Sequence, residues 1–342
     1  MKAERLRSDY LSRWGFDLTL PFCRLLCEER SLGPVAPHDP EEALDGWSTW
    51  CGMFPAFHPI AEDDHAVYGL YRPEADQPGA PVVLRYDVAL CHLHPVARGL
   101  AGLGAWAAYA ALLDEDPDEA ATVVQDLGAA GLEMPQGWPP PASADACSMD
   151  DAERAATGCG AGALLRIAWR RHAAADKAGA LCAAEDACRE APWFVDAWYT
   201  AACLAPSMER RMEALRTAIR QPAALSTRIE GYDLGPDRPE GHVLVACIAE
   251  YRALAPPSND GDPLHAIISA GRGLSSGARI EAAERFVELG SDADAEREML
   301  AAVAVATSEQ EATAASQALA ALYKRQRRDG EAAWCTMLAD TE

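Results

Sequence analysis

The sequence predicts a mostly α-helical protein in two parts: an α+β domain with a small sheet and flanking helices, then an all-α array of helical hairpins. Three observations lead to this fold class. Two runs with the composition of strands, AVYGLY (66–71) and PVVLRYDV (81–88), lie in the N-terminal third. A proline-rich stretch interrupts the chain at residues 134–148. After it the sequence is rich in alanine, and apolar residues recur every three or four positions, as in amphipathic helices.

Local patterns predict the elements of the N-terminal part in order. The stretch LTLPFCRLLCEER (18–30) indicates a short helix with a proline in its first turn. Phe22, Leu25 and Leu26 form the apolar side of this helix. The elements expected after it are a loop at 33–46, a hairpin of strands 66–71 and 81–88 with a long polar connection, a helix at 95–116 and a helix near 117–130.

The clearest domain boundary is the segment MPQGWPPPASADACS, residues 134–148. Three consecutive prolines cannot continue a helix or a central strand, so this segment is expected to be a linker. It separates a domain at 1–133 from a helical domain at 149–342. The helices of the second domain are expected to be divided by Gly- and Pro-containing breakers at 158–162, 231–241, 255–263 and 289–294.

One part of the helical domain has a more specific pattern. In CAAEDACREAPWFVDAWYTAACLA, Ala187 is followed by Pro192 and then by Trp198, and Pro222 lies 30 residues after the first proline. This resembles a tetratricopeptide repeat junction, where small residues let paired helices approach, a proline ends one helix, and a tryptophan opens the next repeat. The resemblance covers roughly 40 residues and implies a tetratricopeptide-like helical domain.

The charge of the chain bears on its partners. The formal net charge is −23, and residues 31–134 hold 17 Asp or Glu against three Arg. Such a surface repels nucleic acid and anionic lipid, and it attracts a basic protein. Solubility alone is the alternative interpretation. We therefore expect no nucleic-acid partner and a protein partner with a basic surface.

The sequence lacks the apolar segments of a membrane protein and of a secretory signal. It has no apolar run of about 18 residues, and its basic N-terminus is not followed by the apolar stretch of a secretory signal. Its eleven cysteines are scattered and form no CxxC pair. We expect them to be free thiols, most of them buried as small apolar residues. These features predict a cytoplasmic protein with no membrane partner.

A run of carboxylates and one histidine precedes the first predicted strand. Four residues make up this group, namely Glu62, Asp63, Asp64 and His65. Adjacent residues on an irregular segment diverge, so they rarely form an acid/base pair, and a solvated turn or a docking surface fits better. A second acidic run, also a docking candidate, consists of Asp114, Glu115, Asp116, Asp118 and Glu119.

Catalytic motifs are weak by comparison. The sequence has no Walker motif, no GxGxxG between a strand and a helix, and no GxSxG. His92 and His94 would share one face of a strand and could hold a metal ion, with His58, His65 or the acidic run as further ligands. No spacing requires such a site. We therefore expect no cofactor and no metal, and a metal-assisted hydrolase that uses His92 and His94 stays an alternative.

The order of short motifs over about residues 9–113 resembles the SUKH superfamily. Its members are α+β domains that commonly act as immunity proteins against bacterial polymorphic toxins, and a related branch includes fungal cell-wall regulators. The matching motifs are Pro59-Ile60-Ala61 followed by Asp63 or Asp64, then Gly69-Leu70, then Val82-Val83.

This resemblance implies a SUKH-like domain at 1–133 and an immunity function. The protein would bind a cognate bacterial toxin effector stoichiometrically and cover its active site or substrate surface, without catalysis of its own. The acidic runs would be the docking carboxylates, since surface charges accelerate encounter and set specificity. A helical-repeat adaptor or scaffold protein is the alternative within the class of binding proteins.

Overall fold

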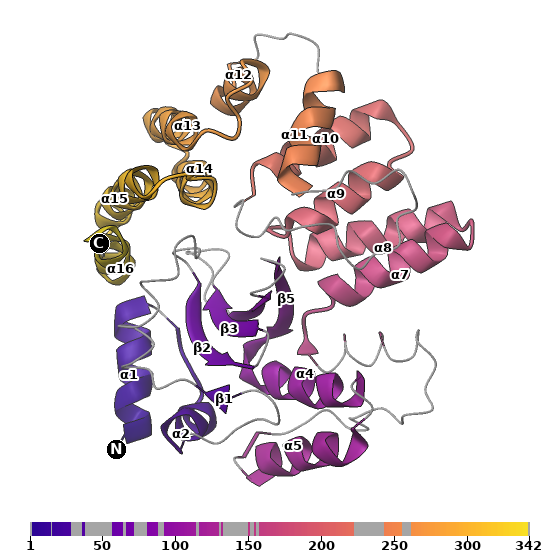
Figure 1. The fold of residues 1–342 in the computed structure, drawn as a ribbon, viewed down its shortest axis with the longest axis vertical. Helices are drawn as coiled ribbons and strands as arrows, with labels where there is room; N and C mark the ends of the chain where they lie inside the picture. The colour runs from indigo at the N-terminus through magenta and orange to yellow at the C-terminus, as the bar shows by residue number, and fades with distance from the viewer. Residues whose placement is uncertain are drawn as a thin grey trace. The chain divides into compact units, whose positions relative to one another are not determined.

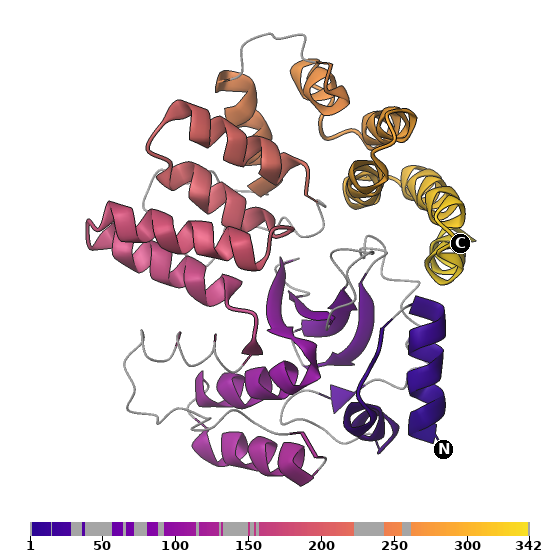
Figure 2. The ribbon, with the colours of Figure 1, turned by 180° about the vertical axis from the view of Figure 1, so that it is seen from behind.

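The computed structural model describes residues 2–14, 16–28, 36–37, 57–63, 66–71, 81–87, 92–113, 116–129, 131–132, 150, 154, 157–221, 243–254 and 261–340. Contacts divide the chain into two compact units, with the boundary between Ile167 and Ala168. Figure 1 shows the elements of both units, and Figure 2 shows them from behind. Over the described residues the protein is mostly helical and has one small antiparallel sheet, which confirms the coarse prediction.

In the first unit, helices α1 and α2 precede the strands in the sequence, and α4 and α5 follow them. The helix predicted at 18–30 is confirmed as α2, and the one near 117–130 is confirmed as α5. The helix α1 lies where no element was predicted. The bounds are α1 Lys2–Trp14, α2 Leu20–Glu28, α4 Gly99–Leu113 and α5 Pro117–Ala129, and α7 at Ala161–Ala173 spans the boundary between the units.

The sheet has five strands in the described residues, ordered β1-β2-β3-β4-β5, and each pairs antiparallel with the next. The predicted hairpin is confirmed: β3 pairs with β4 from Ala66 opposite Asp87 to Tyr71 opposite Val82. The first strand, β1, lies within the stretch predicted as loop, so that prediction is wrong there. The bounds are β1 Ala36–Pro37, β2 His58–Glu62, β3 Ala66–Tyr71, β4 Val82–Asp87 and β5 His92–Arg98.

The predicted helix at 95–116 began four residues too early. Residues 95–98 belong to β5, where Pro95 lies opposite Leu84. A proline lacks the N–H of a ladder, and this strand is at the edge of the sheet, where that loss is tolerated. Gly99 then adopts a φ of 72° and donates its N–H to the carbonyl of Pro81 at 2.7 Å. The glycine turns the chain from strand to helix, since positive φ costs it little.

The core of the first unit lies between the sheet and its helices. In both views α4 and α5 lie side by side next to the sheet (Figures 1 and 2). Tyr68 and Leu70 of β3 belong to one buried cluster with Leu103 of α4 and Leu127 of α5. Close approach requires a glycine at position 104, because a Cβ there would lie 2.4 Å from a methyl carbon of Leu127. Burial of these side chains stabilises the unit by about 1.5–3 kcal/mol each.

The predicted linker, residues 134–148, lies outside the described residues and stays a prediction. Beyond it, the contacts group residues up to Ile167 with the first unit. Asp150 is buried and accepts a hydrogen bond from Nε of Arg166 at 2.9 Å. Gly102 of α4 lies so close to Thr157 that a Cβ at 102 would be 2.5 Å from the Thr157 carbonyl oxygen. The segment after the predicted linker therefore packs with the first unit before the helical unit begins.

The second unit is helical throughout its described residues. Each helix from α8 to α16 packs against the next one, and α9 with α11 and α13 with α15 pack as alternate neighbours. Such a pattern is typical of stacked helical hairpins. The bounds are α8 Lys177–Glu190, α9 Val195–Leu204, α10 Met208–Ile219, α11 Val243–Leu254, α12 Pro263–Ser269, α13 Ser276–Glu288, α14 Asp292–Ala304, α15 Glu309–Arg325 and α16 Asp329–Asp340.

Four helices of the array end in the same hydrogen-bonded turn. After α12 and α13 the left-handed residue is a glycine, Gly271 and Gly290, with φ near 75°. After α7 and α15 that residue is Ala175, with φ 63°, and Arg327, with φ 58°. In each turn the following N–H donates to a carbonyl five residues earlier, as from Arg328 to Tyr323 at 2.9 Å. This Schellman motif favours glycine, so two of the four ends carry backbone strain.

The predicted location of the thiols agrees with the described part of the chain. Eight cysteines lie there, and all eight are free. The buried ones are Cys23, Cys159, Cys188, Cys247 and Cys335. Burial raises the pKa of the Cys188 thiol to about 12 and that of Cys23 to about 11, which keeps both protonated at neutral pH.

Candidate functional site

The first acidic run begins at the end of β2. Glu62 is the last residue of β2 and is exposed, and Asp63 follows it and is half-buried. The Asp63 backbone N–H donates to the carbonyl of Ala66 at 2.8 Å, and its Oδ1 accepts the N–H of Ala66 at 2.7 Å. An aspartate that closes its own turn in this way is a local structural residue. Asp64 and His65 lie outside the described residues.

The second carboxylate oxygen of Asp63 joins the turn to the core. Its Oδ2 accepts the hydroxyl of Tyr68 at 2.7 Å, and Nε1 of Trp106 in α4 donates to that same hydroxyl oxygen at 3.4 Å. Burial is the main reason that the pKa of Tyr68 rises to about 12, and the hydrogen bond to Asp63 adds to the rise. The turn is therefore anchored to β3 and α4, and it holds Glu62 at a defined place on the surface.

The second acidic run starts a helix. Asp116 accepts the N–H of Glu119 at 2.9 Å, which makes it the N-cap of α5. Asp118 and Glu119 occupy the first turn of α5, where negative charge interacts favourably with the helix dipole. Asp118 is exposed and Glu119 is half-buried. Asp114 and Glu115 lie outside the described residues.

The structure thus assigns different tasks to the candidate carboxylates. Asp63 and Asp116 have side chains that accept hydrogen bonds from the chain itself, and their position is explained by local structure. Glu62 ends β2, and Asp118 and Glu119 lie in the first turn of α5. The sequence treated all of them alike, because a carboxylate that caps a turn and one that faces solvent have the same composition.

The two histidines considered as metal ligands lie on the edge strand of the sheet. His92 and His94 both lie on β5, opposite Asp87 and Arg85 of β4. His58, considered as a further ligand, is buried and packs edge-on against Phe16 with ring centroids 5.1 Å apart. No group of three or more His, Cys, Asp or Glu side chains in the described ranges is arranged to hold a metal ion. His65 lies outside these ranges.

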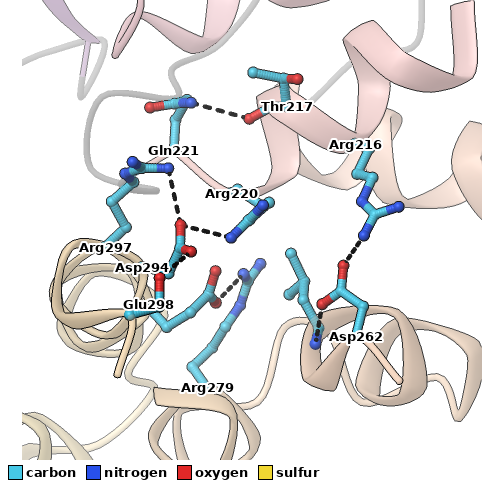
Figure 3. A network of polar contacts seen from close by, with 11 residues as sticks. Arg216, Thr217, Arg220, Gln221, Asp262, Arg279, Asp294, Arg297 and Glu298 are labelled. Atoms are coloured by element: carbon cyan, nitrogen blue, oxygen red, sulfur yellow. Dashed lines mark hydrogen bonds and ion pairs between the residues drawn. The ribbon is translucent and has the colours of Figure 1, made fainter. Parts of the chain in front are cut away.

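A larger polar site lies in the second unit, and sequence reasoning missed it. Four arginines of α10 and its C-cap each pair with a carboxylate of a different helix or helix start. Figure 3 shows two of these pairs, those of Arg216 and Arg220. The residues of α10, which precede Pro222, were interpreted only as part of the tetratricopeptide-like pattern. A signal for this site was present in the sequence, because arginines recur along one short helix and the residues they pair with are acidic. The pairs are Arg210–Glu185 of α8, Arg211–Glu250 of α11, Arg216–Asp262 before α12 and Arg220–Asp294 of α14.

Next to this set lies a fully buried ion pair. The guanidinium of Arg279 in α13 donates to Oε2 of Glu298 in α14 at 2.7 Å, and both side chains are at most 1% exposed. Arg279 also donates to the carbonyls of Gly273 at 2.9 Å and Ile219 at 3.2 Å. Ile219 is the last residue of α10, so this arginine replaces a partner that the end of that helix lacks.

Burial sets the electrostatics of this pair. It raises the pKa of Glu298 above its ordinary value, while Arg279 and, less strongly, Arg220 oppose the rise. Breaking a buried pair leaves an uncompensated charge, which costs about 3–5 kcal/mol. The pair is therefore a structural clasp between α10, α13 and α14, and nothing about it indicates chemistry on a substrate.

The comparisons with known proteins add no family. No protein-family model matches the chain, and no match was found among curated proteins. None of the helices in the described ranges combines the length and the apolar character that a membrane span requires. The function therefore has to be inferred from the residues of this chain and their contacts.

Proposed function

We propose that this chain is a binding protein, and specifically an immunity protein that neutralises a bacterial toxin effector in the cytoplasm. The observation that supports this best is the β2–β3 turn. Asp63 holds it with a backbone and two side-chain hydrogen bonds, and Glu62 beside it is exposed. A carboxylate whose backbone is already held in a strand loses less conformational entropy when it meets a cation on a partner.

The family resemblance supports the immunity function in particular. Its three motifs fall on three adjacent strands: Pro59-Ile60-Ala61 on β2, Gly69-Leu70 on β3 and Val82-Val83 on β4. Gly69 also has a physical reason to be a glycine, because a Cβ there would lie 2.5 Å from the ring of Phe57. The motifs therefore describe one continuous part of the sheet, and the acidic turn is at its end.

The proposed mechanism is electrostatic steering followed by occlusion. A net charge of −23 attracts a basic protein over a Debye length, which is about 10 Å at 0.1 M salt. The charges at Glu62, Asp118 and Glu119 raise the association rate and select basic partners. Once bound, the protein covers the surface that the toxin uses on its substrate.

The test uses the product of the open reading frame adjacent to this gene, purified and immobilised for biolayer interferometry. The variant Glu62→Gln, Asp118→Asn, Glu119→Gln removes three exposed or half-buried charges and leaves both caps in place. We expect about a tenfold slower association at low salt and a smaller difference at 1 M salt, where the Debye length is about 3 Å.

A matched control removes three carboxylates from the second unit, with Glu284, Glu288 and Glu309 changed to Gln. All three are exposed, and the change in net charge is the same. Association close to that of the wild type is expected for the control. Equal slowing of both variants would mean that only the net charge matters, and no binding of the neighbouring gene product at all would remove the immunity proposal.

A helical-repeat adaptor remains the second candidate, because the second unit has the packing pattern of stacked hairpins. The same experiment separates it from the first. If the control variant slows association and the first variant does not, the binding surface belongs to the helical unit.

A further inference from the structure

Two arginines at the C-terminal end of α10 contact three later parts of the second unit: the start of α12, helix α13 and helix α14. Arg216 pairs with Asp262, the N-cap of α12. Arg220 pairs with Asp294 of α14 at 2.5 Å, and its guanidinium carbon lies 5.3 Å from the centroid of the Phe286 ring in α13. Figure 3 shows the two ion pairs, each between α10 or its C-cap and a later part of the unit. One turn of helix thus reaches α12, α13 and α14 through arginine.

A different kind of contact joins α11 to α12. The hydroxyl of Tyr251 and Nδ1 of His265 are 3.0 Å apart, both residues are buried, and their rings pack edge to face. This contact needs no counter-charge and lies on the helix that follows α10 in the array. It is suited to act as a pivot, since small rotations of α12 preserve a single hydrogen bond and a ring contact.

We propose that Arg216, Arg220, Asp262 and Asp294, which we call the ionic junction, form a hinge that sets the orientation of α12–α16 relative to α8–α11. The pairs hold the two halves of the helical unit in one arrangement. Neutralising a junction charge releases the halves to rotate about the contact between Tyr251 and His265. This inference is independent of the proposed function of the first unit.

The solvent exposure of the junction favours a hinge over a fixed contact. The junction side chains are partly exposed, with 23% of Arg220 and 22% of Asp294 accessible to solvent. Water can therefore reach both partners when the pair opens, so opening costs less than breaking a fully buried pair. A bound partner or a charge change can outweigh a cost of this intermediate size, which makes the ion pair a suitable control element.

The neighbouring clasp is the contrasting case. Arg279 and Glu298 are fully buried, so opening that pair would strand two charges. The clasp also holds the last carbonyl of α10, at Ile219. We therefore expect the clasp to stay closed during the hinge motion, so that the two halves rotate and do not separate.

The experiment measures the distance between the two halves by pulsed electron spin resonance. Spin labels are attached through p-acetylphenylalanine at positions 182 and 317, which are exposed on α8 and α15, so the other cysteines remain unlabelled. For the otherwise unchanged chain we expect one narrow distance distribution. Arg220→Gln should at least double its width, and Arg216→Gln should broaden it less.

The control is Arg297→Gln. Arg297 pairs with the same carboxylate, Asp294 at 3.2 Å, but from within α14, so it does not cross the junction. We expect its distribution to match that of the labelled parent. Unchanged width in folded Arg220→Gln, or equal broadening in Arg297→Gln, would overturn the proposal. If Arg220→Gln does not fold by circular dichroism, the more exposed Arg216→Gln decides, and an unchanged width there has the same consequence.

Discussion

Replacing Arg279 with methionine tests the most consequential contact in the helical unit. The change removes a buried cation and leaves the Glu298 carboxylate without its partner, which costs about 3–5 kcal/mol. The carbonyls of Gly273 and Ile219 also lose a donor, at about 1 kcal/mol each. We therefore expect the free energy of unfolding of this unit to fall by about 5–7 kcal/mol, measured by urea denaturation and circular dichroism at 222 nm.

The double variant Arg279→Met, Glu298→Met separates the two contributions. It removes the stranded carboxylate and keeps the loss at the two carbonyls, so it should lie only about 2 kcal/mol below the wild type. The matched control is Arg285→Met, on the same helix, whose side chain is 56% exposed and 3.7 Å from Glu281. That change should cost less than about 0.5 kcal/mol.

The loss of stability in Arg279→Met should depend on pH in a defined direction. Burial raises the pKa of Glu298 in the folded protein above its ordinary value, and removing Arg279 takes away the main opposing charge. The folded variant then takes up a proton that the unfolded chain does not hold until lower pH. Its stability relative to the wild type should therefore rise as the pH falls from 8 towards 5, by at most about 1.4 kcal/mol per unit. A deficit independent of pH, or a single variant no less stable than the double one, would refute the reasoning.

The helix ends, the Asp63 contacts and the thiols each allow a further test. Arg327→Gly and Ala175→Gly should each raise the free energy of unfolding by about 0.5–1 kcal/mol, because φ is near 60° at both; Ala174→Gly, one residue earlier, should not, and thermal denaturation distinguishes them. Asp63→Ala should destabilise the first unit by about 2–3 kcal/mol through the loss of two hydrogen bonds, whereas Glu62→Ala should change it by less than about 0.5 kcal/mol; equal effects would contradict the assignment of Asp63 to the turn. Ellman's reagent should react with Cys182 and Cys203, which are exposed, before denaturation and with Cys188, Cys247 and Cys335 only after it; mass mapping of the labelled thiols checks the order.

Features that depend on neighbouring residues could be predicted from the amino-acid pattern alone. The period of apolar residues predicted the helical unit and α2, and alternating apolar residues predicted the hairpin of β3 and β4. Both signals are local, because a helix repeats over a few residues and a hairpin joins strands that are close in the chain. The strong acidity of the first part was also available from composition alone.

Which polar residues hold the fold together depends on how distant segments pack. The sequence did not predict β2, because its proline and charged end hide a strand that is specified by pairing with β1 and β3. It did not distinguish Asp63, which accepts a hydrogen bond from Tyr68, from Glu62 beside it. It also gave no sign that Arg279 would be buried. An arginine on a helix has the same local pattern whether it faces water or a carboxylate 19 residues away, so its role is decided by the packing of helices that local periodicity does not specify.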